Sequence, residues 1–180
     1  MKVFIAGPRA LSILNNEILY RLNNIMLNNF TVLVGDANGI DTSVQKFYAE
    51  NNYSNVLVYA ANGKARNNIG NWNVVNIQVS PNTKGFDYYS AKDLEMAKES
   101  DCGFMIWNGT SKGTLNNIIN IINFGKKALV YFVPNKIFYM IKTREDINSL
   151  IERCEQSTKK LYNNLMQKEN LQLSFLTKII

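Results

Sequence analysis

Two glycine-rich loops contain the residues best suited to hold an anionic ligand. The first loop comprises Gly35, Asp36, Asn38, Gly39 and Asp41, and the second comprises Gly109, Ser111, Lys112, Gly113 and Thr114. Each loop follows an apolar run and precedes a stretch of helical periodicity. Backbone N–H groups at a helix N-terminus bind phosphate well, and hydroxyl groups and a lysine strengthen such a site. The two loops therefore predict phosphate binding; the alternative is that both are only tight strand–helix turns.

Neither loop matches the best-known phosphate-binding motifs. A P-loop ends in Gly-Lys-Ser/Thr, whereas Lys112 precedes Gly113 here. Neither loop reads Gly-x-Gly-x-x-Gly, the dinucleotide fingerprint. No metal-ligand spacing is recognisable in the sequence. We therefore expect neither a cofactor nor a bound metal.

Acidic and aromatic side chains near the expected ends of elements are further candidates. Asp87 and Asp93 are the carboxylates that could act in catalysis, and Asp93 equally suits the first turn of a helix, where a negative charge is stabilising. Tyr89 and Trp107 could stack on a nucleobase, or they could pack in the core.

The chain has no histidine. This excludes Ser-His-Asp and Cys-His mechanisms and every zinc site that uses histidine. Any acid–base chemistry would have to use Asp, Glu, Lys, Tyr or Cys. Cys102 and Cys154 are too few and too far apart for a disulfide scaffold or a zinc site.

The net charge is +6, which favours anionic partners. The excess is spread along the chain, because residues 1–135 hold 12 basic and 9 acidic side chains and residues 136–180 hold 8 and 5. Lys64 and Arg66 lie in a polar, glycine-containing stretch and could reach a phosphate. We expect a solvated basic surface; a nucleic-acid footprint is the less favoured alternative.

Short β-branched runs alternate with stretches of helical periodicity, which is typical of an α/β domain with a mostly parallel sheet. We expect strands over residues 2–6, 31–35, 55–59, 74–79, 102–107 and 128–133, and helices over residues 11–28, around 44–48, over 91–100 and from the second loop to about 124. The predicted fold is a three-layer Rossmann-like sandwich over residues 1–142. Residues 143–180 form an amphipathic helical extension that either packs on the sheet or pairs with another subunit.

Four segments of the chain occur in a recognisable order. They are Val3-Phe4-Ile5-Ala6-Gly7-Pro8-Arg9, the glycine-rich loop that ends at Asp41, Lys92-Asp93-x-x-Met96 followed by Asp101, and Gly109-x-Ser111-x-Gly113-Thr114. Together they resemble the SLOG superfamily of Rossmann-like nucleotide-binding proteins over about residues 1–135. The likeness is greatest to a small stand-alone branch with a Gly-Gly-Ala-x-Gly-Ala-Asp loop.

The superfamily includes lonely-guy phosphoribohydrolases, nucleoside deoxyribosyltransferase-like enzymes, DNA-processing proteins that bind single strands, and sensor domains for cyclic ADP-ribose-like signals. The resemblance implies a ligand with a ribose or phosphate across the ends of the first, second and central strands, with Gly7, Pro8 and Arg9 beside it. It also implies a homo-oligomer.

One departure from the superfamily bears on activity. Its enzymes carry a Gly-Thr-x-x-Glu run whose Glu acts at the anomeric carbon, and Asn117 stands at that position here. An amide is neither a base nor an anionic nucleophile at neutral pH. We therefore expect a non-catalytic sensor or sink for a nucleotide or ADP-ribose-like ligand. The alternative is an N-glycosidase or deoxyribosyltransferase-like enzyme that uses Asp93 or Asp87.

The N-terminal sequence passes directly from Lys2 into an apolar strand and lacks the features of a secretory signal. No apolar run approaches the length of a membrane span, ~18 residues. We expect a cytoplasmic protein that does not enter a membrane.

Overall fold

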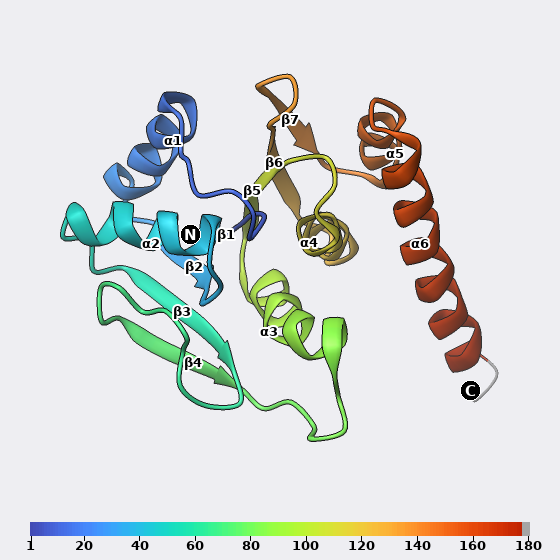
Figure 1. Ribbon diagram of the computed structural model, residues 1–180, viewed down its shortest axis with the longest axis horizontal. Helices are drawn as coiled ribbons and strands as arrows, with labels where there is room; N and C mark the ends of the chain where they lie inside the picture. Colours follow the sequence, from blue (N-terminus) through green and yellow to red (C-terminus); the bar gives the residue numbers. More distant parts are fainter. Residues whose placement is uncertain (178–180) are drawn as a thin grey trace.

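The computed structural model describes residues 1–177 and arranges them around one seven-stranded sheet (Figure 1). The strands are β1 (Lys2–Ala6), β2 (Thr31–Gly35), β3 (Val56–Ala61), β4 (Asn73–Ile77), β5 (Cys102–Trp107), β6 (Lys127–Phe132) and β7 (Ile137–Ile141). Their order across the sheet is β4-β3-β2-β1-β5-β6-β7. All neighbours are parallel except β6 and β7. The fold is thus α/β and Rossmann-like, which confirms the predicted class.

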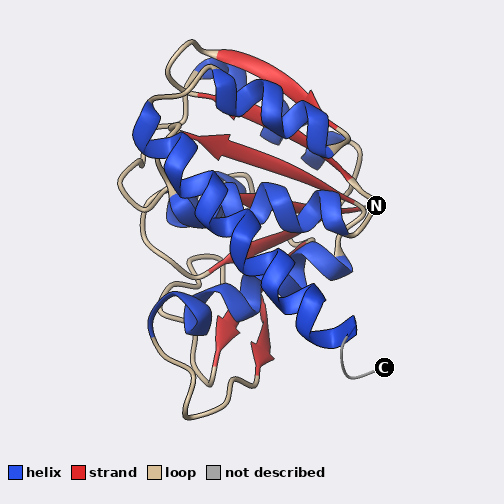
Figure 2. Cartoon of the chain, turned by 90° about the vertical axis from the view of Figure 1, so that its right-hand side faces the viewer, coloured by secondary structure: helices blue, strands red, loops and turns tan. Residues whose placement is uncertain are grey.

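Helices cover both faces of the sheet. They are α1 (Asn16–Leu27), α2 (Ile40–Glu50), α3 (Gly85–Glu99), α4 (Lys112–Asn123), α5 (Arg144–Glu152) and α6 (Gln156–Thr177). Side chains alternate between faces along a strand, so Val3 and Ile5 of β1 pack with α1 and α2, whereas Phe4 and Ala6 pack with α3 and α4. Strand directions turn from one edge of the sheet to the other, as sheet twist requires (Figure 2).

The direction of strand addition reverses between β1 and β5. The chain builds β1 to β4 outward along one half of the sheet, and α3 then returns it to β5, on the other side of β1. In register, Phe4 of β1 lies between Leu33 of β2 and Gly103 of β5. Ligands of open α/β sheets bind beyond the carboxyl ends of the strands at such a reversal. This crevice is therefore where a binding site is expected.

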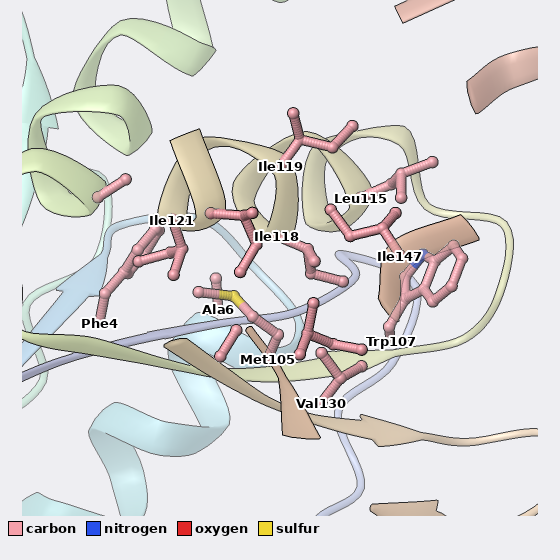
Figure 3. Packing of buried hydrophobic residues seen from close by; sticks show 14 of the residues in the cluster. Phe4, Ala6, Met105, Trp107, Leu115, Ile118, Ile119, Ile121, Val130 and Ile147 are labelled. Atoms are coloured by element: carbon pink, nitrogen blue, oxygen red, sulfur yellow. The ribbon is translucent and has the colours of Figure 1, made fainter. Parts of the chain in front are cut away.

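The C-terminal helices are part of the same core. Ile147 of α5 and Tyr162 of α6 belong to the buried cluster that contains Met105, Trp107 and Leu115, and Figure 3 shows Ile147 beside Trp107 and the α4 side chains. The amphipathic stretch thus packs back on the sheet. It is also two helices rather than one, because a short break separates α5 from α6.

Several other element boundaries also differ from those predicted, including the start of α3 at Gly85 instead of residue 91. The first helix begins at Asn16 instead of residue 11, because the side chain of Asn15 accepts a hydrogen bond from the N–H of Ile18 and caps the helix there. Strand β7 was not predicted at all. No helix among residues 1–177 combines the length and the apolar character needed to cross a bilayer.

Candidate functional site

A cavity of about 580 Å³ lies over the carboxyl ends of β1 and β5. Its walls are residues 6–10 after β1, the first three turns of α3, and the β5–α4 loop with the start of α4. It coincides with the crevice where strand addition reverses. The structure therefore brings together Gly7, Pro8 and Arg9 with the second glycine-rich loop, as the sequence predicted.

The second loop is built as an anion cradle. The Asn108 side chain accepts hydrogen bonds from the N–H groups of Thr110 and Ser111 at 3.2 and 2.9 Å, which shapes the turn. Ser111 caps α4, because its hydroxyl accepts from the N–H of Thr114. The first N–H groups of a helix have no partner within the helix, and those of Lys112 and Gly113 belong to residues that line the cavity.

Two buried side chains fix the conformation of this loop by donating hydrogen bonds to its carbonyl oxygens. Trp107 is 0% exposed, and its ring N–H donates to the carbonyl oxygen of Ser111 at 3.1 Å. Thr158 of α6 donates its hydroxyl hydrogen to the carbonyl oxygen of Gly109 at 2.6 Å. The prediction that Trp107 stacks on a ligand is therefore wrong, because its ring is enclosed by the core. Its contribution is to position Ser111.

The first loop is used differently. Only Ala37 and Asp41 of that loop line the main cavity. A Cβ at Gly39 would lie 2.5 Å from the carbonyl oxygens of Pro8 and Arg9, and Gly39 has φ +84°. This glycine thus permits close packing of two backbone segments. Gly35 likewise leaves room for the side chains of Asp41 and Lys92.

A buried cluster of charges lies between the first loop and α3. The ammonium group of Lys92 is 2.6 Å from Asp93 and 4.0 Å from Asp36. Arg66 donates to both carboxylate oxygens of Asp36, at 2.6 and 2.9 Å. Asp41 accepts from the N–H of Ala37 at 3.2 Å. Asp36 is therefore engaged in this cluster and is separated from the cavity.

The cluster changes the pKa of its members in different directions. Burial raises the pKa of Asp41 to about 6, although the charge of Lys92 opposes that rise. Burial also acts to raise the pKa of Asp36, but hydrogen bonds from Arg66 outweigh it and leave the pKa below its usual value. Burial acts to lower the pKa of Lys92, and the charges of Asp93 and Asp41 more than reverse this. Lys92 is thus held as a cation at neutral pH.

Cations contact aromatic rings at the main cavity and next to it. The guanidinium groups of Arg9 and Arg66 lie 4.8 and 5.2 Å from the centre of the Tyr89 ring. The Lys112 ammonium lies 4.0 Å from the centre of the Phe86 ring. Tyr89 is 40% exposed. Phe86 thus contacts one cation and Tyr89 contacts two, and both rings belong to the N-terminal part of α3.

Basic side chains also lie beyond Tyr89. A smaller cavity of about 270 Å³ lies on that side and shares Tyr89 and Lys92 with the main one. Lys64 and Arg66 contribute to its wall. A long ligand could therefore pass from one hollow to the other across the Tyr89 ring.

The two candidate carboxylates lie in different places. Asp93 lines the main cavity, whereas Asp87 is exposed and lines a neighbouring groove between α3 and α6. Asn117, at the position of the superfamily's catalytic Glu, is buried in the cavity wall and donates to Asp93 at 3.4 Å. Asp87 is therefore removed from the group that could act on a ligand in this cavity.

Several residues that line the cavity were not predicted to contact a ligand, among them Phe86, Lys92, Asn108 and Thr110. Lys92 offered a signal, because a lysine on the same helical face as Met96 needs a partner for its charge when that face is buried. Phe86 was missed because α3 begins earlier than expected.

The sequence matches no protein-family model and no curated protein sequence. Its structure is similar to that of DNA processing protein A from Helicobacter pylori, a protein described by its binding of single-stranded DNA. The two share 14% identity with a TM-score of 0.56, over 93% of this chain and 81% of the other. At this identity, the likeness shows a shared fold.

This comparison corrects the function expected from the sequence. The similar protein is described by its binding of single-stranded DNA, which is a polymer. The expected sensor or sink for a nucleotide or ADP-ribose-like ligand is therefore wrong. Membership of the SLOG superfamily is not confirmed, whereas the Rossmann-like α/β fold of this chain is.

Proposed function

We propose that this chain binds single-stranded DNA across the carboxyl edge of its sheet. The observation that carries the proposal is a set of cation–ring contacts: Lys112 with Phe86 and Arg9 with Tyr89 at the main cavity, and Arg66 with Tyr89 toward the smaller cavity. Proteins that bind single strands combine a positively charged groove with rings on which bases stack. These cations and rings meet both needs, and they extend over two adjoining hollows.

Phosphates of the strand would lie on the cations and on the α4 N-terminus. The free N–H groups of Lys112 and Gly113 suit a phosphate at the main cavity. Arg9 suits a phosphate beside Tyr89, whereas Arg66 is already bound to Asp36. A base would stack on the half-exposed Tyr89 ring by displacing the Arg9 guanidinium from it toward that phosphate. The fold shared with a protein that binds single-stranded DNA supports the same proposal. So does the resemblance to the SLOG superfamily, which includes DNA-processing proteins.

The proposal is tested by fluorescence anisotropy with a labelled 20-nucleotide dT strand. We expect binding that weakens steeply as salt is raised, because each phosphate contact releases counterions. The variant Tyr89→Ala should weaken binding by roughly tenfold, since loss of one stacked base costs about 1–3 kcal/mol. Tyr20→Ala is the matched control, because Tyr20 is 62% exposed and contacts Arg21 on the distant α1.

Two results would contradict the proposal. One is equal affinity for the dT strand in low and high salt, and the other is an equal loss of affinity in Tyr89→Ala and Tyr20→Ala. A large excess of dTMP that fails to displace the strand would separate polymer binding from binding of a free nucleotide. Light scattering on the same preparation would measure self-association, which stays a prediction.

A further inference from the structure

The floor of the main cavity differs from its rim in hydrogen-bonding character. The rim offers donors, namely the cations, the first N–H groups of α4 and the hydroxyls of Thr110 and Ser111. The floor offers acceptors, because Asp93 and Asn117 lie side by side there, one on α3 and one on α4. A nucleotide in this cavity is thereby oriented, with its phosphate at the rim and the donor edge of its base at the floor.

The two floor residues have unused acceptor capacity. One oxygen of Asp93 accepts from Lys92 at 2.6 Å and the other from the Asn117 amide at 3.4 Å, but an ionised carboxylate can accept about four hydrogen bonds. The Asp93 side chain is 18% exposed, so it can be reached from the cavity. The carbonyl oxygen of Asn117, a residue 3% exposed, has no hydrogen-bond partner among the described residues. Buried acceptors of this kind are normally satisfied.

From this floor we infer that the cavity selects guanine when the bound strand places one base in it. The inference rests on the proposed function. Guanine has two neighbouring donors, the ring N1–H and the 2-amino group, and a carboxylate can accept both at once. The second hydrogen of the amino group would then be available to the Asn117 carbonyl. The cavity volume of about 580 Å³ lies within the usual range for ligands of nucleotide size.

The other bases fit this floor less well. Adenine and cytosine each place a ring nitrogen lone pair beside their amino group, and that lone pair would face the carboxylate. Thymine has a single N–H between two carbonyl oxygens, and both oxygens would be repelled. Only guanine has an edge with two neighbouring donors, so discrimination comes from repulsion of the other bases as well as from attraction.

Lys92 acts as a positioning residue in this scheme. The Lys92 ammonium is buried and contacts one carboxylate oxygen of Asp93, which fixes the rotamer of that side chain. Its charge also offsets a carboxylate that would otherwise repel a polyanion. Asp93 can therefore read a base without excluding the DNA backbone.

The first test changes only the ligand. Labelled 12-nucleotide dT strands carry one central dG, dI, dA or dC, and anisotropy gives the affinity of each. We expect dG to bind roughly tenfold more tightly than dA, dC or dT, in line with the discrimination of a good bidentate contact. Inosine keeps N1–H but lacks the 2-amino group, so dI should lie between dG and the others.

The second test changes the floor. Asp93→Asn keeps the size of the side chain but introduces a donor, so the affinity ratio of dG to dA should fall to about one. Asp87→Asn is the matched control on the same helix, outside the cavity, and should keep the full ratio. The ratio is the readout because a general loss of folding or of phosphate binding lowers both affinities together.

The outcomes separate this inference from the function on which it rests. If all strands bind equally, or if Asp93→Asn keeps the preference for dG, guanine selection is wrong while DNA binding stands. If no strand binds at low salt, the proposed function itself fails. A preference for dG that disappears in Asp93→Asn and persists in Asp87→Asn supports both.

Discussion

The two glycine-rich loops have similar compositions but different structural roles. In the second loop, Gly113 has open space around it and lines the cavity. In the first loop, Gly39 is pressed against the carbonyl groups of Pro8 and Arg9, and Asp36 is bound to Arg66. The difference arises from charge, because the first loop adds two buried carboxylates that need Lys92 and Arg66 as partners. A glycine-rich turn is thus a binding loop only where its neighbours leave its N–H groups unoccupied.

The largest effect is expected from Lys92→Met, which removes the central cation from the first loop's cluster. Asp36, Asp41 and Asp93 would lose a partner that is 4% exposed. Removing one member of a buried ion pair costs about 3–5 kcal/mol, and urea unfolding at pH 7 measures it. Lys98→Met on the same helix should change stability by less than about 0.5 kcal/mol, because an exposed pair contributes little. Equal effects would show that the cluster is not a structural unit.

A second pair of variants compares the two loops directly. Gly39→Ala should lower the free energy of unfolding by about 3 kcal/mol, because a side chain at positive φ is strained and its Cβ would clash with backbone. Gly113→Ala should leave stability equal or slightly higher, since Ala is the better helix former by up to about 1 kcal/mol. Its methyl group would instead lower affinity for DNA. If the two variants are equally unstable, the distinction between the loops fails.

The third expectation concerns pH. The pKa of Asp41 is about 6 in the folded protein and 3.8 in the unfolded chain, so the folded state holds the extra proton between these values. Stability should therefore fall by about 2–3 kcal/mol as pH rises from 4 to 6, at ~1.4 kcal/mol per unit of pKa shift. The lowered pKa of Asp36 acts in the opposite sense, and its contribution is lost only as pH falls through and below that group's usual value.

Asp41→Asn is the variant that isolates this effect. It should remove most of the pH dependence between pH 4 and 6 in urea unfolding, because the amide does not titrate and can still accept from Ala37. An unchanged pH profile in this variant would assign the dependence to other groups.

Local signals were enough for much of the fold. The limits predicted for β1, β2 and β5 agree with the structure, because each is a short apolar run bounded by turn residues or charge. Strand β7 was missed because only a short turn separates it from β6, and this turn does not mark the start of a new element in the sequence. The break before α6 was missed because apolar spacing continues through it.

The site was predicted most completely where its residues are adjacent in sequence. The second loop was identified because its glycines, hydroxyls and lysine are adjacent. Phe86 and Lys92 belong to the site only because α3 returns across the sheet to reach β5, and that placement depends on tertiary packing. Trp107 was misread for the same reason, since its burial depends on α4 and α5.

The hydrogen bond from Thr158 to Gly109 has a consequence for engineering. It joins a helix more than 40 residues downstream to the turn that begins the second loop. Transplanting residues 107–114 into another Rossmann-like scaffold would leave the Gly109 carbonyl without this donor, so the turn would have to be redesigned. The C-terminal helix is for this reason a component that a designer must carry along with the loop.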